Sequence, residues 1–125
     1  MSNNYFQDIF DELQTVLPEE WKKVVFYAEY ALNSYSMKFF VGTGRGKYLD
    51  CYDIPELRAR DIDNTFRSIH KILTPIRKSL SKKDTWTVLT MVIDRNGKFK
   101  ADYDYSSHDK ILITWESAWR KKYLK

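Results

Sequence analysis

The sequence contains one cysteine, Cys51, and no apolar run long enough to cross a bilayer. A single cysteine cannot form an internal disulfide, which argues against the small secreted domains that depend on several such bridges. A membrane-spanning helix needs roughly 20 apolar residues. Residues 1–20 are amphipathic and acidic, unlike a secretion signal, which is basic and then apolar. We therefore expect a cytoplasmic protein with no membrane partner.

Histidine, the side chain that most often acts as a general acid or base, is also scarce, with only two in the chain. His70 lies at the edge of an apolar helical stripe, which favours a boundary histidine. The run Ser106-Ser107-His108-Asp109 is contiguous, so its side chains cannot converge in the order of a catalytic triad. One cysteine and two distant histidines match no zinc-binding spacing. We predict no catalytic, cofactor-binding or metal-binding residues, and no enzymatic activity.

Two other patterns resemble functional motifs only superficially. The segment 42–47, Gly-Thr-Gly-Arg-Gly-Lys, lacks the Lys-Ser/Thr ending and the following helix of a phosphate loop, so we expect a hairpin loop. Asp102 and Asp104 share one face of a predicted strand, as carboxylates that bind a metal can do. Lys98 and Lys100 lie on the same face, which favours a solvated charged strand.

The composition is that of a globular domain rich in aromatic residues. The 125 residues are 43% hydrophobic and 30% charged, which predicts one domain over residues 1–125. Aromatic residues make up 16%, with nine tyrosines, as in a binding surface or a small sheet protein. Tryptophan-bearing phrases begin and end the chain without chemically active groups, which points to a protein that binds another protein.

Hydrophobic periodicity predicts an α+β protein. Helices are expected over residues 4–17, 56–81 and 109–123, and strands over residues 22–31, 37–41, 48–52, 86–93 and 98–105. Pro75 should kink the second helix or divide it at Leu73–Thr74. The segment 94–97, Asp-Arg-Asn-Gly, predicts a type I′ hairpin turn. The order α-βββ-α-ββ-α predicts a single antiparallel sheet of about five strands with helices packed on one face.

Charge is distributed unevenly along the chain. Residues 1–56 carry a net charge of −4, residues 57–83 carry +6, and residues 84–125 carry +2. Five cations of the middle segment fall on one line of a helix: Arg60, Arg67, Lys71, Lys78 and Lys82. Such a stripe can follow a phosphate backbone, although the solvent face of an amphipathic helix looks the same. A small nucleic-acid-binding domain using residues 60–82 is therefore the alternative function.

Several phrases, taken in order, carry a family resemblance. They are Leu17-Pro18-Glu19-Glu20-Trp21, Tyr27-Ala28-Glu29, Met37-Lys38-Phe39-Phe40, Trp86, Phe99-x-x-Asp102-Tyr103-Asp104-Tyr105 and the Trp119-x-Lys-x-Tyr-Leu ending. Over nearly its whole length the chain resembles the YezG-like family of immunity proteins, or antitoxins. Members neutralise toxin domains at the C-termini of secreted polymorphic toxins, including those exported by type VII secretion. The resemblance implies an α+β protein that blocks one cognate toxin by direct contact, and several such toxins are nucleases.

The positive net charge departs from what a nuclease inhibitor usually shows. Either the acidic N-terminal portion forms a local anionic patch for a basic toxin, or the toxin presents an acidic surface and is not a nuclease. Charged residues beside aromatic residues are the expected partner contacts: Arg45, Asp50, Asp53, Asp102 and Asp104. Charge complementarity would select the partner, and packed aromatic anchors would supply the affinity.

Overall fold

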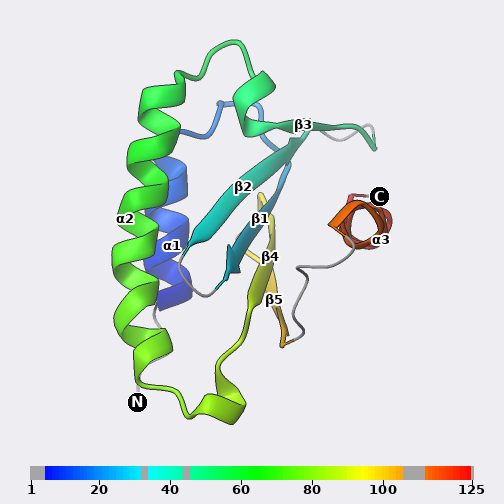
Figure 1. Cartoon of the computed structure of the whole chain (residues 1–125). Helices are drawn as coiled ribbons and strands as arrows, with labels where there is room; N and C mark the ends of the chain where they lie inside the picture. Colours follow the sequence, from blue (N-terminus) through cyan, green and yellow to red (C-terminus); the bar gives the residue numbers. More distant parts are fainter. Residues whose placement is uncertain (1–4, 32–33, 44–45, 106–111, 125) are drawn as a thin grey trace. The chain divides into compact units, whose positions relative to one another are not determined.

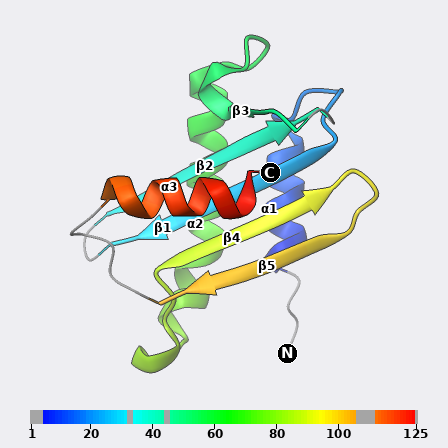
Figure 2. The ribbon, with the colours of Figure 1, turned by 90° about the vertical axis from the view of Figure 1, so that its right-hand side faces the viewer.

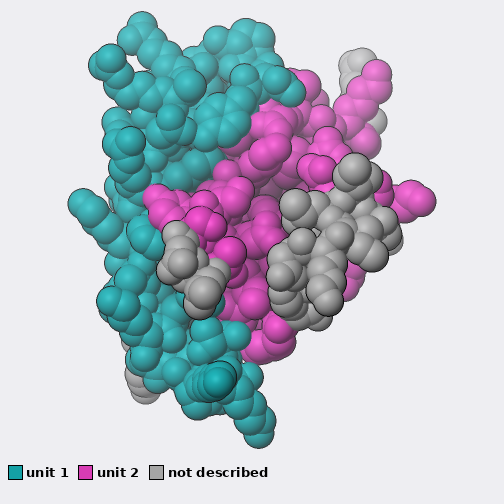
Figure 3. Space-filling view, viewed as in Figure 1, with its two compact units in different colours: residues 1–19, 52–85 teal, residues 20–51, 86–125 magenta. Residues whose placement is uncertain are grey.

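The computed structural model describes residues 5–31, 34–43, 46–105 and 112–124, with side chains from residue 116 onward in the last range. The chain forms two compact units, coloured in Figure 3: residues 1–19 with 52–85, and residues 20–51 with 86–125. The first unit is helical, and the second contains a sheet and one helix. The single-domain assignment stays a prediction.

The first unit is built on two helices, α1 (Tyr5–Gln14) and α2 (Ala59–Lys78), which pack against each other. Each helix buries one apolar stripe, as the spacing of its hydrophobic residues predicts. In α1 the stripe includes Ile9 and Leu13, both fully buried. In α2 it comprises Ile62, Phe66, Ile69 and Leu73. Both predicted helices are confirmed, and both are shorter than expected, since α1 ends at Gln14 and α2 at Lys78.

The predicted division of the second helix at Pro75 is wrong, because α2 runs without interruption to Lys78. Proline lacks a backbone N–H, so it costs the helix one i→i−4 hydrogen bond. Pro75 lies in the last turn, where few further bonds depend on it. Its carbonyl still accepts a bond from Ser79 N at 3.1 Å, so the helix closes normally after the proline.

The second unit holds a single antiparallel sheet. Its strands are β1 (Lys23–Tyr30), β2 (Tyr35–Gly42), β3 (Tyr48–Asp50), β4 (Val88–Asp94) and β5 (Phe99–Asp104). They lie in the order β3-β2-β1-β4-β5, and Figure 2 shows the sheet face-on. All neighbouring pairs are antiparallel. The predicted α+β class and the five-stranded antiparallel sheet are confirmed.

Alternation along β1 gives the sheet two different faces. Val24, Phe26 and Ala28 point to one face and are fully buried. Val25, Tyr27 and Glu29 point to the other face, which also carries the third helix, α3 (Leu112–Tyr123). Figures 1 and 2 show α3 over the central strands on that face. We call this surface of the sheet the α3 face.

The turn between β4 and β5 differs from the predicted type I′ turn. Asp94 N donates to Lys98 O at 2.8 Å, which leaves residues 95–97 as the loop. Gly97 has φ +90°, and no described residue other than glycine has a positive φ. A type I′ turn needs positive φ at both central residues, here Asn96 and Gly97. The φ of Asn96 is not positive, so the turn is not of type I′. The loop instead combines an ordinary turn with a left-handed glycine, and Asn96 Oδ1 accepts from Lys98 N at 3.1 Å.

The predicted third strand is shorter than expected. The third strand ends at Asp50, and Cys51 is buried in the 3-10 helix η1 (Cys51–Asp53) rather than in a strand. The final helix begins at Leu112. The predicted loop and cap at residues 106–109 lie outside the described residues.

Candidate functional site

One tryptophan fixes α3 to the sheet. Trp119 is 5% exposed, and its indole Nε1 donates to Thr90 Oγ1 on β4 at 3.0 Å. Its ring packs edge-on against Tyr27 at 5.0 Å between centroids and tilted against Phe40 at 5.5 Å. A buried indole N–H needs an acceptor, and Thr90 supplies it. Trp119 therefore sets both the depth and the position of the helix.

A tyrosine near the end of α3 makes the second attachment. Tyr123 Oη donates to Asp102 Oδ2 on β5 at 2.8 Å, and its ring lies 5.4 Å from that of Trp119. Burial, the hydrogen bond to Asp102 and the charges of Asp102 and Asp104 raise the pKa of Tyr123 above its ordinary value. The phenol therefore stays protonated, and keeps donating to the carboxylate, to a higher pH than an ordinary tyrosine would.

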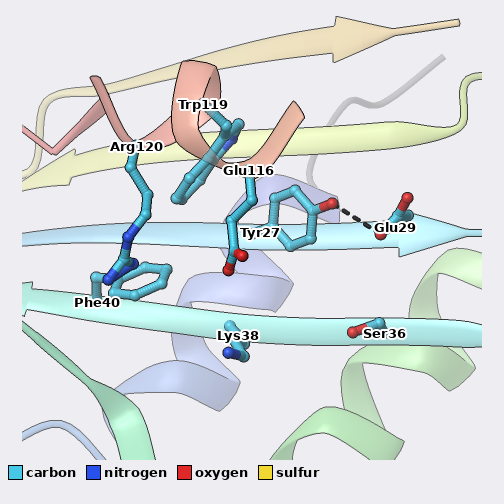
Figure 4. Close-up of a pocket in the computed structure, with 8 residues that line it drawn as sticks. All are labelled: Tyr27, Glu29, Ser36, Lys38, Phe40, Glu116, Trp119 and Arg120. Carbon is cyan, nitrogen blue, oxygen red and sulfur yellow. Dashed lines mark hydrogen bonds between the residues drawn. The ribbon is translucent and has the colours of Figure 1, made fainter. Parts of the chain in front are cut away.

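A hollow of about 250 Å³ lies beside α3, between the helix and strands β1 and β2. Figure 4 shows charged groups of both signs around an aromatic floor. Arg120 lies 5.1 Å from the centre of the Phe40 ring, and Tyr27 Oη donates to Glu29 Oε1 at 2.8 Å. The lining residues are Tyr27, Glu29, Ser36, Lys38, Phe40, Glu116, Trp119 and Arg120.

A second hollow, of about 270 Å³, lies on the other side of α3, over β4 and β5. Its walls include Asp102, Asp104 and Lys122, so it is also charged. Trp119 lines both hollows and separates them. The α3 face is therefore a ridge of helix with a charged depression along each side.

The size and chemistry of these depressions suit a protein partner better than a small ligand. Ligand pockets usually enclose roughly 300–1,000 Å³, whereas both hollows are smaller, partly open and include charged groups of both signs. Within the described part of the chain, no cluster of three or more His, Cys, Asp or Glu side chains could hold a metal ion. None of the described helices is long and apolar enough to cross a membrane.

The structure places three of the predicted contact residues on the α3 face. Asp50 pairs with Lys38, whose Nζ lies 3.3 Å from Asp50 Oδ2. Asp102 and Asp104 project from β5 at the opposite edge of the sheet from Asp50. Four inter-strand spacings of about 4.8 Å separate β3 from β5, so these aspartates lie roughly 19 Å from Asp50. Asp102 is half-buried beneath Tyr123, so this strand face is only partly solvated. The three carboxylates share a surface without forming one cluster.

The other two predicted residues do not join that group. Arg45 lies outside the described residues. Asp53 is exposed in η1 and belongs to the helical unit. Neither therefore adds to the geometry of the α3 face.

Sequence reasoning missed the residues that shape the first hollow, notably Lys38, Glu116 and Arg120. A signal for Lys38 was present, because β1 and β2 alternate between apolar residues and polar ones. The register pairs Tyr27 with Lys38 and Glu29 with Ser36, which brings the polar positions to one face. The α3 residues could not be placed, because nothing in the sequence states which face of the sheet the last helix covers.

The basic stripe of the sequence is real and lies on α2. Arg60, Arg67, Lys71 and Lys78 are exposed along the helix, and Lys82 is exposed in η2 (Lys82–Asp84). Because α2 continues past Pro75, these helical cations stay within one narrow line. His70 lies beside the stripe, and burial lowers its pKa, which favours the neutral ring.

Comparisons with known proteins cover nearly the whole chain. Residues 2–125 match the family model described as "Immunity protein YezG-like". The chain is 31% identical over 106 residues to "Immunity protein YezG" of Bacillus spizizenii, a match that covers 80% of this chain and 66% of that protein. It is 31% identical over 115 residues to the Bacillus subtilis protein of the same name, covering 87% of this chain and 74% of that one. The chain thus spans just under two thirds of the length of the first relative.

Proposed function

The chain belongs to the YezG-like family of immunity proteins, and from this premise we propose that it binds and neutralises a cognate secreted toxin domain inside the producing cell. The proposed action is stoichiometric binding rather than catalysis. The observation that supports it is the α3 face, where shallow charged hollows flank a helix held by buried aromatic groups. Such a surface can match another protein in shape and charge.

The α3 face has the two components that tight inhibition needs. Binding energy in protein interfaces comes mainly from a few aromatic or arginine anchors near the centre. Arg120, stacked on Phe40, and the partly buried ring of Tyr27 occupy that central position. Charged groups around the rim speed association and reject wrong partners. We propose that Asp50 at one edge and Asp102 and Asp104 at the other serve this second role.

Both signs of charge occur on the α3 face, which bears on the identity of the toxin. Lys38 and Arg120 lie in one hollow with Glu29 and Glu116, so a partner must present both acidic and basic groups there. The second hollow is more acidic than the first, because its lining has Asp102 and Asp104 against one cation, Lys122. We propose that this hollow meets a cationic substrate site, which favours a nuclease as the toxin.

The decisive test uses the proposed cognate toxin domain. Its affinity for the wild-type chain and for Arg120→Glu should be measured by calorimetry, together with rescue of growth when both proteins are made. Charge reversal in the hollow should weaken binding at least tenfold, equivalent to about 1.4 kcal/mol. Equal affinity of the wild-type and Arg120→Glu chains would rule out this hollow as the binding surface.

Lys121→Glu is the matched control. It makes the same change of sign one residue further along α3, at an exposed position that lines neither hollow. We expect affinity within about threefold of wild type, the range of a rim charge. Asp50→Lys and Asp104→Lys extend the test to the two edges, where each should slow association more than it speeds dissociation.

The α2 stripe supports a second candidate function, nucleic-acid binding. The specific observation is the unbroken helix through Pro75, which keeps four exposed cations in line along α2. If the stripe binds phosphates, affinity for duplex DNA or RNA should fall by about 10-fold or more between 50 and 200 mM salt. Lys71→Glu with Lys78→Glu should abolish that binding. No binding at 50 mM salt would eliminate this function.

A further inference from the structure

One edge of the sheet is long enough to pair with another strand. β5 is the terminal strand beyond β4 and has six residues, whereas the opposite terminal strand, β3, has three. Figure 2 shows β5 along the border of the sheet. A terminal strand can serve as a template for strand addition. Lysines commonly protect such edges, and β5 with its preceding residue contains two, Lys98 and Lys100.

Two antiparallel copies of this strand place residues of opposite charge, and aromatic residues, opposite each other. Residues 98–104 read Lys-Phe-Lys-Ala-Asp-Tyr-Asp. In an antiparallel pair centred on Ala101, Lys100 of each strand lies opposite Asp102 of the other. Lys98 then lies opposite Asp104, and Phe99 opposite Tyr103. Opposite charges and aromatic pairs facing each other across strands are both stabilising. Lysines that would repel a copy in other registers therefore attract it in this one.

The hydrogen bonds of β5 to β4 permit this register. Asp94 N donates to Lys98 O and Thr87 N donates to Asp104 O, so even-numbered residues direct their backbone groups toward β4. The backbone N–H and C=O groups of successive residues point to opposite sides of a strand. Those of odd-numbered residues such as Ala101 therefore point away from β4, toward the outside of the sheet. Centring on Ala101 pairs odd residues with odd residues, so the outward backbone groups of the two copies meet in the alternation that an antiparallel ladder requires. A shift of one residue would lose both the pairing of outward backbone groups and the pairing of opposite charges.

We propose that a second copy of this chain adds along β5, with the two strands antiparallel and a twofold axis at Ala101. The two sheets then continue into one another, and both α3 helices lie on the same side. The contact is self-complementary and closes at two copies, as symmetric dimers do. This self-association shares Asp102 and Asp104 with the proposed toxin-binding surface, but it needs only the chain itself and is therefore tested in the absence of the toxin.

The first experiment separates strand pairing from other modes of association. Sedimentation of the full chain from roughly 1 to 300 µM should show a concentration-dependent species of twice the 15.0 kDa chain mass. Ala101→Pro removes an outward N–H, a change that edge strands tolerate, and should leave a folded monomer. Lys100→Pro removes an N–H directed at β4 and should instead lower the melting temperature. A monomer at every wild-type concentration, or a dimer that survives Ala101→Pro, would overturn the proposal.

A charge exchange tests the register itself. In the proposed register, residue 100 of each copy lies opposite residue 102 of the other, so the dimer contains this pair twice. Lys100→Asp makes both pairs Asp–Asp, and Asp102→Lys makes both pairs Lys–Lys. Each variant alone should dimerise about tenfold more weakly or worse, while an equimolar mixture should form heterodimers. Tyr123→Phe is the control, because it also removes the hydrogen bond to Asp102 but keeps the charges, and it should dimerise normally. Failure of the mixture to pair would refute this register.

Discussion

The attachment of α3 to the sheet can be tested through the bond between Trp119 and Thr90. Thr90→Val keeps the shape of a residue that is 3% exposed and removes the acceptor 3.0 Å from the indole nitrogen. Leaving a buried N–H without a partner costs about 1–3 kcal/mol. For 125 residues, about 2.1 cal/mol/K per residue gives a fall of roughly 4 °C in melting temperature for each kcal/mol. We therefore expect a decrease of roughly 4–12 °C.

A double-mutant cycle isolates the bond from the packing around it. Trp119→Phe removes the donor and part of the ring, so it should destabilise by itself through lost contacts with Tyr27 and Phe40. Once the donor is absent, Thr90→Val should cost less, because no indole N–H is left unsatisfied and only the hydrogen bond between Thr90 and Tyr123 is lost. Urea unfolding of the four proteins should give a coupling of about 1 kcal/mol. Costs that add within about 0.3 kcal/mol would refute the role assigned to this bond.

Three further changes have defined outcomes. The fold raises the pKa of Tyr123 above the ordinary 10.0. The stability that the protonated Tyr123 phenol contributes is therefore complete below pH 10 and is lost as the pH rises further. One tyrosine should thus ionise late in a spectrophotometric titration, and Tyr123→Phe should remove that late step. Gly97→Ala should cost about 1 kcal/mol, because φ is +90°, and Gly97→Asn should cost less; equal costs in urea unfolding would contradict this. Pro75→Ala should raise the unfolding free energy by about 1–3 kcal/mol by restoring a helical N–H, and no gain would show that Pro75 is accommodated without cost.

Much of the fold could be predicted because its signals are local. The apolar stripes of α1 and α2 follow helical spacing, and β1, β4 and β5 follow strand patterns. Prediction from short sequence patterns failed where the surrounding structure selects one of several conformations that the same residues can adopt. Asn-Gly fits more than one hairpin turn, and the loop of residues 95–97 uses only Gly97 in the left-handed region. A proline in the last turn breaks one bond, too few to end α2.

The candidate site was predicted only in part, because it depends on which elements meet. Charge beside aromatic residues identified Asp50, Asp102 and Asp104, and the strand register does bring them to one face. Glu116 and Arg120 join that face only because Trp119 finds its acceptor on β4. That contact spans 29 residues of sequence, and no spacing pattern encodes it. The register and the docking of α3 thus complete a surface that the sequence shows only in fragments.

Amide hydrogen exchange of the chain, alone and bound to its toxin domain, tests the central claim most directly. If the toxin covers the α3 face, amides of β2 at residues 36–40 and of α3 at residues 116–123 should exchange more slowly in the complex. The amides of α2 at residues 59–78 should be unchanged. Slower exchange confined to α2, with none on the α3 face, would contradict the proposed binding surface.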